Sequence, residues 1–402
     1  MSLNNRLGVT PEGTRDLLFE ESLARREMER RLTGLFTRRG FSEVMTPGIE
    51  FFDMFQRGGA ALPAESMYKL VDGKGRLLVI RPDSTTPIAR LTATRLREAP
   101  LPVRLYYAQD VYHVNHGLSG HNDQEFQAGI ELIGVAGERA DLEVISLAAE
   151  ALRACAVGDC RLEIGHVGFF RALLGELAVD EETRAELHTY IETKNYAALS
   201  DLLDTLPASE AVDAMRLLPR LFGGEEVLAA ARRLCRNAEA GAALDYLAGL
   251  YQALCRLGLG GQVMIDLGMV HRNEYYTGVI FRGYMEGSGE TVVSGGRYDN
   301  LLQQFGSPLP ATGFGVNVDA LTKCLLTGGQ VAPPKPPRVL VHAESGCETQ
   351  ALALLAKLTA EDVVGEFSVF ETRADAEAYA RRRGIAELTV VSADGVHTES
   401  LQ

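Results

Sequence analysis

The segment EFQAGIELIG (125–134) decides the fold, because apolar residues alternate along it with polar or small ones. The apolar members, which share one face of a β-strand, are Phe126, Ala128, Ile130 and Leu132. The opposite face carries Gln127, Gly129 and Glu131. We expect the apolar face to lie on a core and the polar face to form the floor of a pocket. A polar face turned to solvent fits the same alternation, so this strand alone leaves both interpretations open.

Further strand-like segments lie on both sides of this strand. They are LLVIRPD (77–83), VRLYYAQDVYHV (103–114), QVMIDLG (262–268), the predicted hairpin VIFRGYM (279–285) with ETVVSGG (290–296), and the start of PATGFGVNVDALTKCL (310–325). Helical periodicity covers 19–39 and 138–155, and 310–325 ends as a helix. This order predicts an α+β fold, with an antiparallel sheet flanked by helices. The strands before and after residue 168 must share one sheet if the pocket is to close.

The composition along the chain predicts two domains and an insertion. Residues 1–167 and 259–328 form the predicted core, and 168–258 is rich in Leu, Ala, Glu and Arg, which indicates a helical insertion. A proline-rich linker spans 329–337, where the run VAPPKPP should be stiff and extended. Residues 338–402 alternate strand and helix patterns, which predicts a small α/β domain with a parallel sheet.

Charge and cysteine usage exclude several classes of protein. The 402 residues include 54 acidic and 40 basic side chains, a net charge of −14, and such a surface repels nucleic acid phosphates. The six cysteines are scattered without a CxxC pair, which suits a reducing compartment. No apolar run approaches the roughly 20 residues that a membrane helix needs, and the first residues lack a signal-peptide pattern. We expect a soluble, cytoplasmic protein without a membrane or tRNA partner.

Common catalytic motifs are absent from the sequence. It has no GxxxxGK[ST] phosphate loop, no GxGxxG opening a helix, no GxSxG and no HExxH. His113, His116 and His121 cluster near Asp110 and Asp123, but they lie around the glycine-rich run GLSGHND, which is poorly suited to fixing ligands. We therefore expect no metal site and no cofactor.

Polar residues at several strand ends could meet in one pocket. They are Arg81, Asp83, Thr85, Gln127, Glu131, the run Glu274-Tyr275-Tyr276, and Tyr298 after a glycine pair. Carboxylates and amides can hold an ammonium group, while a carboxylate and a phenol can bind a second, planar polar group. The set fits a free amino acid better than a phosphate ester. The alternative is that these residues are ordinary polar side chains at strand ends, without a ligand.

Several motifs, in the same order, resemble the catalytic core of class II histidyl-tRNA synthetase over roughly residues 5–325. They are GFSEVMTPGIE (40–50), IRPDSTTPIAR (80–90) with RLYYAQDVYHV and QAGIELIG, EYYTGVIF (274–281), SGGRYDNLLQQFG (294–306) and PATGFGVNVDAL (310–321). The resemblance implies the class II synthetase-like fold and a dimer formed through the first motif. It also implies that residues 338–402 are a truncated counterpart of the anticodon-binding domain.

The arginines that this family uses to neutralise ATP are missing. The second-motif position is His113, the position before the Tyr-Tyr pair is His271, and the third-motif position is Ala320. The loop position that often supplies another arginine reads Gly-His-Asn at 120–122. Neutral histidine cannot replace the permanent planar fork of arginine, so we expect ATP activation to be lost.

The resemblance implies that this chain retains the part of the synthetase site that binds the amino acid. Its histidine-binding positions correspond here to Asp83, Thr85, Gln127, Glu131, Tyr275, Tyr276 and Tyr298, with Arg272 beside the lost arginine. A chain that keeps this half and loses the other is similar to the regulatory subunits of ATP phosphoribosyltransferase. That resemblance implies a non-catalytic subunit that binds the short catalytic subunit, as a hetero-octamer, and responds to histidine in histidine biosynthesis. The alternatives are an active but divergent histidyl-tRNA synthetase, or a paralogue that binds another amino acid or modifies a protein.

Overall fold

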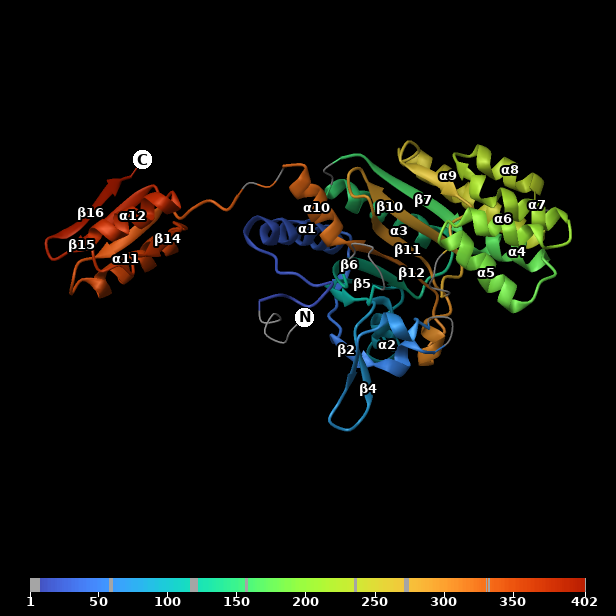
Figure 1. Cartoon of the computed structure of the whole chain (residues 1–402), viewed down its shortest axis with the longest axis horizontal. Coiled ribbons are helices and arrows are strands. Elements are labelled where there is room, and N and C mark those ends of the chain that lie inside the picture. The colour runs from blue at the N-terminus through green and yellow to red at the C-terminus, as the bar shows by residue number, and fades with distance from the viewer. Residues whose placement is uncertain are drawn as a thin grey trace. The chain divides into compact units, whose positions relative to one another are not determined.

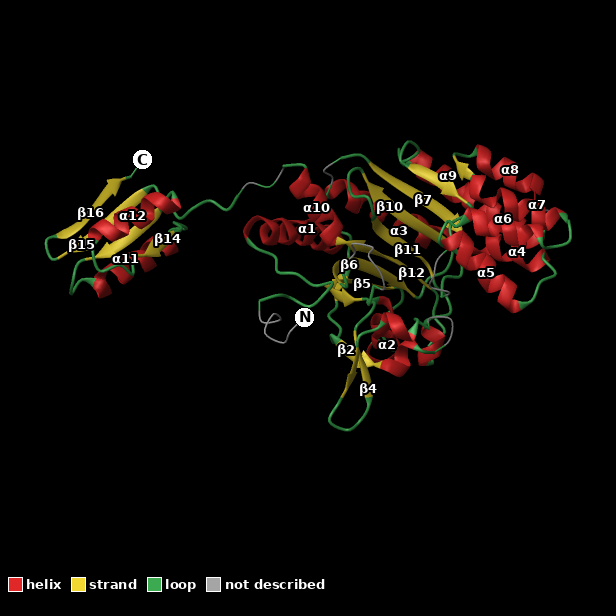
Figure 2. Ribbon diagram, viewed as in Figure 1, coloured by secondary structure: helices red, strands yellow, loops and turns green. Residues whose placement is uncertain are grey.

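The computed structural model describes residues 8–57, 61–115, 122–155, 158–234, 237–270, 275–329, 331 and 333–401. The chain divides into two compact units, Met1–Val331 and Ala332–Gln402. Figure 1 labels most of their helices and strands, and Figure 2 distinguishes helices from strands by colour. Among the described residues, no helix is both long and apolar enough to cross a membrane.

A nine-stranded sheet forms the centre of the first unit, in the order β1-β5-β6-β12-β11-β10-β7-β9-β8 within the described residues. The strands are β1 (Ser42–Glu43), β5 (Val103–Tyr112), β6 (Gln124–Ile133), β7 (Cys160–His166), β8 (Phe222–Gly223), β9 (Val263–Asp266), β10 (Val279–Met285), β11 (Thr291–Arg297) and β12 (Ala311–Asn317). Neighbours from β5 to β7 are antiparallel, whereas β1 pairs parallel with β5 and β9 parallel with β7. The predicted hairpin and the predicted sharing of one sheet by strands on both sides of the insertion are confirmed.

Three helices cover one face of this sheet (Figure 1): α1 (Phe19–Arg38), α3 (Glu138–Ala154) and α10 (Val318–Thr327). The apolar side chains of β6 enter this core, where Ala128 and Ile130 are fully buried. Helix α1 begins and ends close to the predicted 19–39, and its buried residues are Ala24, Met28, Leu32, Leu35 and Phe36. The pocket-forming face is therefore the opposite one.

That opposite face is partly covered by α2 (Thr85–Arg95), which packs into a second core around Ile88 and Tyr107. Helix α2 follows a three-stranded sheet in the order β2-β4-β3, made of β2 (Ile49–Phe51), β3 (Lys69–Val71) and β4 (Leu77–Ile80). The chain leaves β4 at Ile80, earlier than the predicted 77–83, so that Arg81 and Asp83 lie in the turn before α2.

The inserted region is mostly helical, as expected. Its helices are α4 (Val167–Glu176), α5 (Glu181–Glu192), α6 (Tyr196–Asp204), α7 (Glu210–Leu217), α8 (Glu226–Leu234) and α9 (Ala238–Arg256). It also contributes β8, which pairs with β9 and so extends the main sheet. A two-residue strand carries no recognisable period, and the sequence did not indicate it.

The second unit contains the predicted β-α-β-α-β order. A parallel sheet β14-β13-β15 is formed by β13 (Val339–Ala343), β14 (Gly365–Phe367) and β15 (Glu387–Ser392), with helices α11 (Glu348–Ala360) and α12 (Arg373–Arg383). An additional strand, β16 (Gly395–Ser400), pairs antiparallel with β15. The prediction ended with β15 and missed this edge strand.

Candidate functional site

The floor of the candidate pocket is built from glycines opposite polar side chains. Glu131 of β6 pairs in register with Gly313 of β12, which pairs with Gly296 of β11. A Cβ at Gly313 would lie 2.0 Å from Oε2 of Glu131, and one at Gly296 would lie 2.9 Å from Cδ1 of Tyr276. The absent side chains therefore leave room for Glu131 and Tyr276 to lie across the sheet.

Glu131 is the buried centre of this pocket, with 2% of its surface exposed. Thr85 Oγ1 donates a hydrogen bond to Oε1 of Glu131 at 2.7 Å, and the hydroxyl of Tyr298 donates to Oε2. Burial raises the pKa of Glu131 to about 8, despite the two hydroxyl donors that act in the opposite direction. The side chain consequently carries a proton at neutral pH.

Aromatic rings enclose this carboxyl group. The ring centroids of Tyr275 and Tyr276 lie 4.6 Å apart, and Tyr275 meets Tyr298 edge-on at 5.7 Å. Burial raises the pKa of Tyr276 to about 12 and raises the pKa values of Tyr275 and Tyr298 well above the ordinary value of a phenol. All three phenols are therefore neutral and can donate as well as accept hydrogen bonds.

Asp83 and Gln127, two further predicted site residues, bond to groups other than Glu131 and the tyrosines that enclose it, which we call the tyrosine cage. Asp83 accepts hydrogen bonds from the backbone N–H of Thr86 at 2.7 Å and from its hydroxyl at 3.0 Å, at the start of α2. Gln127 lies four residues before Glu131 on the same face, and its Nε2 donates to Oε1 of Glu125 at 2.6 Å. Gln127 lines a neighbouring cavity of about 310 Å³ rather than the tyrosine cage.

Some sequence candidates have other roles or lie outside the described residues. Arg81 is buried and donates to the backbone oxygens of Thr46 at 2.8 Å and Asp110 at 2.6 Å, so it joins strands instead of facing the pocket. Arg272 and Glu274 lie outside the described residues, as do His116 and His121. Among the residues that the structure describes, no cluster of His, Cys, Asp and Glu is suited to a metal ion.

Two contributors were not singled out from the sequence. The hydroxyl of Tyr107, on β5, lies so close above Gly129 that a Cβ there would meet it at 2.6 Å. Arg171, from α4 of the insertion, donates through Nη2 to the backbone oxygen of Tyr276 at 2.9 Å. The pairing of Tyr107 with Gly129 follows from strand register, and the reach of Arg171 follows from tertiary packing, so neither had a local signal.

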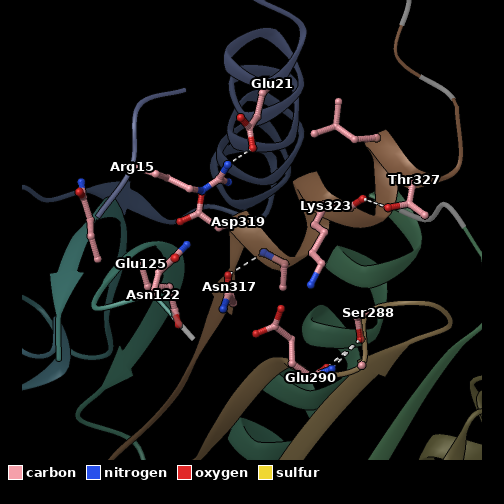
Figure 3. Close-up of a pocket in the computed structure, with 14 residues that line it drawn as sticks. Arg15, Glu21, Asn122, Glu125, Ser288, Glu290, Asn317, Asp319, Lys323 and Thr327 are labelled. Carbon is pink, nitrogen blue, oxygen red and sulfur yellow. Dashed lines mark hydrogen bonds and ion pairs between the residues drawn. The ribbon is translucent and has the colours of Figure 1, made fainter. Parts of the chain in front are cut away.

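A larger cavity, of about 630 Å³, lies where α1, α10 and the start of β6 meet, and its described lining is mostly polar, with more acidic than basic side chains (Figure 3). Its charged side chains are Glu21, Glu125, Glu290 and Asp319 against Arg15 and Lys323. Burial raises the pKa of Glu125 to about 7. Ala320, at the third-motif arginine position, also lines this cavity. Such a lining repels a triphosphate.

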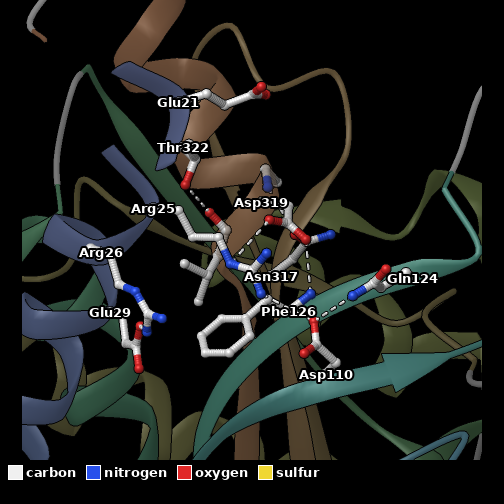
Figure 4. A network of polar contacts seen from close by, with 12 residues as sticks. Glu21, Arg25, Arg26, Glu29, Asp110, Gln124, Phe126, Asn317, Asp319 and Thr322 are labelled. Carbon is white, nitrogen blue, oxygen red and sulfur yellow. Dashed lines mark hydrogen bonds and ion pairs between the residues drawn. The ribbon is translucent and has the colours of Figure 1, made fainter. Parts of the chain in front are cut away.

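Asp319 bonds to neighbouring elements of the fold (Figure 4). Its Oδ2 accepts the backbone N–H of Phe126 at 2.8 Å, which fastens α10 to β6. Arg25 of α1 lies over the Phe126 ring, 4.2 Å from the centroid, and donates to Oδ1 of Asp110 at 3.0 Å. The arginine nearest to this acidic group is therefore occupied by carboxylates and an aromatic ring.

His113 does not replace the missing second-motif arginine. Burial lowers the pKa of its imidazole below the ordinary value, and Asp123 opposes that shift only in part. The ring is thus neutral at neutral pH, and a neutral ring cannot balance phosphate charge.

Comparison with known proteins places this architecture in a family. Residues 13–321 match the family model described as histidyl-tRNA synthetase. The ATP phosphoribosyltransferase regulatory subunit of Clostridium kluyveri is 39% identical over 383 residues, which cover 94% of this chain and 98% of that protein. The chain belongs to the family of ATP phosphoribosyltransferase regulatory subunits. The regulatory subunit of Bacillus cereus strain AH187 is 38% identical over 388 residues, covering 96% of this chain and 91% of that protein.

Solved structures agree with membership of the regulatory-subunit family. A crystal structure from Bacillus halodurans, described as an ATP phosphoribosyltransferase regulatory subunit/histidyl-tRNA synthetase, has a TM-score of 0.83 at 30% identity and covers 96% of this chain and 97% of its own. The histidyl-tRNA synthetase of Nostoc, at 19% identity and a TM-score of 0.74, covers 98% of this chain and 96% of its own and shares the fold. The family and fold predicted from the motifs are confirmed.

Proposed function

We propose that this regulatory subunit binds free histidine around Glu131 and relays it as feedback inhibition to the short catalytic subunit of ATP phosphoribosyltransferase. The catalytic subunit carries out the first step of histidine biosynthesis. The observation that carries the proposal is the buried Glu131, bonded to Thr85 and Tyr298 inside a cage of neutral phenols.

The chemistry of the cage suits an imidazole. Glu131 holds a proton at neutral pH, and the imidazole of histidine is then largely neutral, so the two can share one proton without burying a net charge. The Tyr276 hydroxyl, which already accepts a hydrogen bond from Tyr275, would form a further hydrogen bond with the second ring nitrogen. A site that hydrogen-bonds both nitrogens discriminates strongly against apolar amino acids of similar size, because these would leave its polar groups unpaired.

The α-amino and carboxylate groups of histidine would bind at the edge of the cage. We assign the ammonium to Asp83, Thr85 and Gln127, and the carboxylate to Arg272. Within the described residues, the hydrogen bonds noted above join Asp83 and Gln127 to near neighbours in the sequence, so a ligand could replace these contacts without separating distant elements.

Reconstitution with the short catalytic subunit tests the proposal. We expect the mixture to form phosphoribosyl-ATP, and histidine to inhibit it. Tyr276→Phe should preserve activation and raise the histidine concentration for half-inhibition about tenfold, since it removes one hydrogen bond to the ligand. Tyr196→Phe, on an exposed part of α6, is the matched control and should behave like the parent chain.

The same preparation distinguishes the synthetase alternative. The acidic cavity and Ala320 predict no histidine-dependent ATP–pyrophosphate exchange. Robust exchange by the chain alone would contradict a purely regulatory role, and full inhibition of the Tyr276→Phe complex at the parent's histidine concentration would place the feedback site elsewhere.

We also propose that the core dimerises through the sheet β2-β4-β3, within a hetero-octamer with the catalytic subunit in the cytoplasm. Phe51, Leu78 and Leu70 lie side by side in register on one face of that sheet. On the same face, Ile49, Phe51 and Leu70 are 50%, 49% and 39% exposed, an unusual concentration of exposed apolar surface. The described cysteines are free thiols, which suits a reducing compartment.

A double charge substitution tests the dimer. Phe51→Asp with Leu70→Asp should convert the isolated chain to a monomer in sedimentation velocity, because two carboxylates would be buried without partners at the interface. Val369→Asp, at an exposed position of the second unit, should leave the oligomeric state unchanged. A double variant that remains dimeric would rule out this face.

A further inference from the structure

A separate cavity lies at the junction of the insertion and the core, on the backbone side of Tyr276. Its volume is about 420 Å³, and it is bounded by α4, α5, Val270 and Tyr276 (Figure 1 locates the two helices). It shares Tyr276 with the histidine pocket but none of Asp83, Thr85, Gln127 or Glu131. It is therefore a distinct space with its own chemistry.

Basic residues outnumber acidic ones in the described lining of this cavity. Arg171 extends from α4 and Arg184 from α5, the His188 imidazole of α5 adds a further polar ring, and Glu181 is the one carboxylate among the described lining residues. This balance is unusual in a chain with a net charge of −14. A basic recess on an acidic surface attracts small anions selectively, since larger polyanions are repelled by the surroundings.

Arg184 has donor capacity that the protein does not use. Its Nε is buried and has no hydrogen-bond partner within the described part of the chain. Buried donors are nearly always paired, because an unpaired one has lost its water without replacement. An acceptor from a bound ligand would satisfy this N–H group.

The other two basic residues are fixed in position. Arg171 is oriented by its hydrogen bond to the Tyr276 backbone oxygen at 2.9 Å. His188 is held edge-on against the Phe170 ring, with centroids 5.7 Å apart. Each residue thus has a contact that restricts its side chain, which reduces the entropy lost when an anion binds.

We propose that this cavity binds a phosphate-bearing small molecule, with Arg171, Arg184 and His188 as its anion ligands. Tetrahedral phosphate oxygens can accept from guanidinium groups that approach from two different helices, whereas a planar carboxylate matches a single fork. Phe170, Leu174 and Val270 line the same cavity and supply an apolar wall for the carbon skeleton of the ligand.

Calorimetric titration of the full chain at constant ionic strength tests this site. Inorganic phosphate and phenyl phosphate are the probes, and benzoate is the carboxylate comparison. We expect saturable binding of both phosphates, tighter for phenyl phosphate because of the apolar wall, and at least tenfold weaker binding of benzoate. Comparing the affinities of the two phosphates shows whether the site binds the free anion or a phosphorylated organic molecule.

Arg184→Gln should weaken phenyl phosphate binding at least tenfold without lowering the melting temperature, since it removes an unpaired donor. Arg233→Gln, an exposed arginine on α8 of the same insertion, is the matched control and should bind like the parent chain. Absence of saturable phosphate binding, equal affinity in Arg184→Gln, or benzoate binding as tight as phenyl phosphate would each overturn the proposal.

Discussion

Glu131→Gln should abolish the response to histidine while making the chain more stable at alkaline pH. The glutamine amide keeps the size of the side chain and can still bond to Thr85 and Tyr298, but it cannot share a proton with an imidazole. Loss of a buried, charge-assisted hydrogen bond costs about 2–5 kcal/mol, so histidine affinity should fall at least thirtyfold in calorimetry.

The gain in stability follows from the raised pKa of Glu131. An unfolded glutamate ionises near pH 4.5, whereas the folded one keeps its proton up to about pH 8. Between these values only the folded state holds the proton, so the free energy of unfolding falls as pH rises, by about 1.4 kcal/mol per unit from this group. Glutamine does not ionise, and the variant should therefore exceed the parent by roughly 3–5 kcal/mol at pH 8.5 relative to pH 4.5.

Chemical denaturation at both pH values, alongside the histidine titration, measures both effects. Glu163→Gln is the control, because burial also raises the pKa of this glutamate, which lies on β7 of the same sheet outside the cage. It should preserve histidine binding. A Glu131→Gln chain that binds histidine normally would refute the assignment of the pocket, and one that gains no stability with pH would refute the buried protonated state.

Asp141→Asn should destabilise the first unit more than any substitution at its surface. Asp141 is fully buried on α3, and its carboxylate pairs with Arg297 of β11 through Nη2 at 2.7 Å and Nε at 3.0 Å. Tyr246 of α9 donates its hydroxyl to the same carboxylate. The variant removes the buried charge partner of Arg297 and leaves only the more exposed Asp299, which costs about 3 kcal/mol of unfolding free energy.

Two milder variants calibrate this loss in denaturant unfolding. Tyr246→Phe removes only the hydroxyl and should cost about 1 kcal/mol. Asp299→Asn affects the more exposed carboxylate, 3.0 Å from Nη1 of Arg297, and should cost less than Asp141→Asn. If Asp141→Asn changed the unfolding free energy by less than 1 kcal/mol, the ion pair would not be the contact that joins insertion, α3 and sheet.

The sequence predicted the structure well where the apolar residues repeat with the period of a strand or a helix. The alternation along 125–134 correctly separated the face of β6 that packs against the helices from the face that carries Glu131, and the 19–39 period located α1. The motif order identified the family, and the residues of the cage could be named before their arrangement was known.

Contacts between distant segments could not be predicted in this way. Tyr298 reaches Glu131 only because β11 and β12 align their glycines with it, a register set by strands more than 160 residues apart. The sequence also did not indicate that Arg81 would donate its hydrogen bonds to backbone oxygens, or that Gln127 would bond to Glu125. The acidic lining of the large cavity combines α1, α10 and a hairpin turn, which no single stretch reveals.

The acidic side chains of that cavity bear on which small molecules the chain can respond to. Cells contain abundant nucleotides, and their concentrations follow energy supply. If the chain still bound nucleotides as a synthetase does, its response would depend on nucleotide concentration as well as on histidine concentration. Because acidic side chains outnumber basic ones in the cavity that Ala320 borders, a triphosphate would be repelled there, and the proposed sensor would answer to histidine rather than to nucleotides at this cavity. It can therefore measure the end product without consuming it.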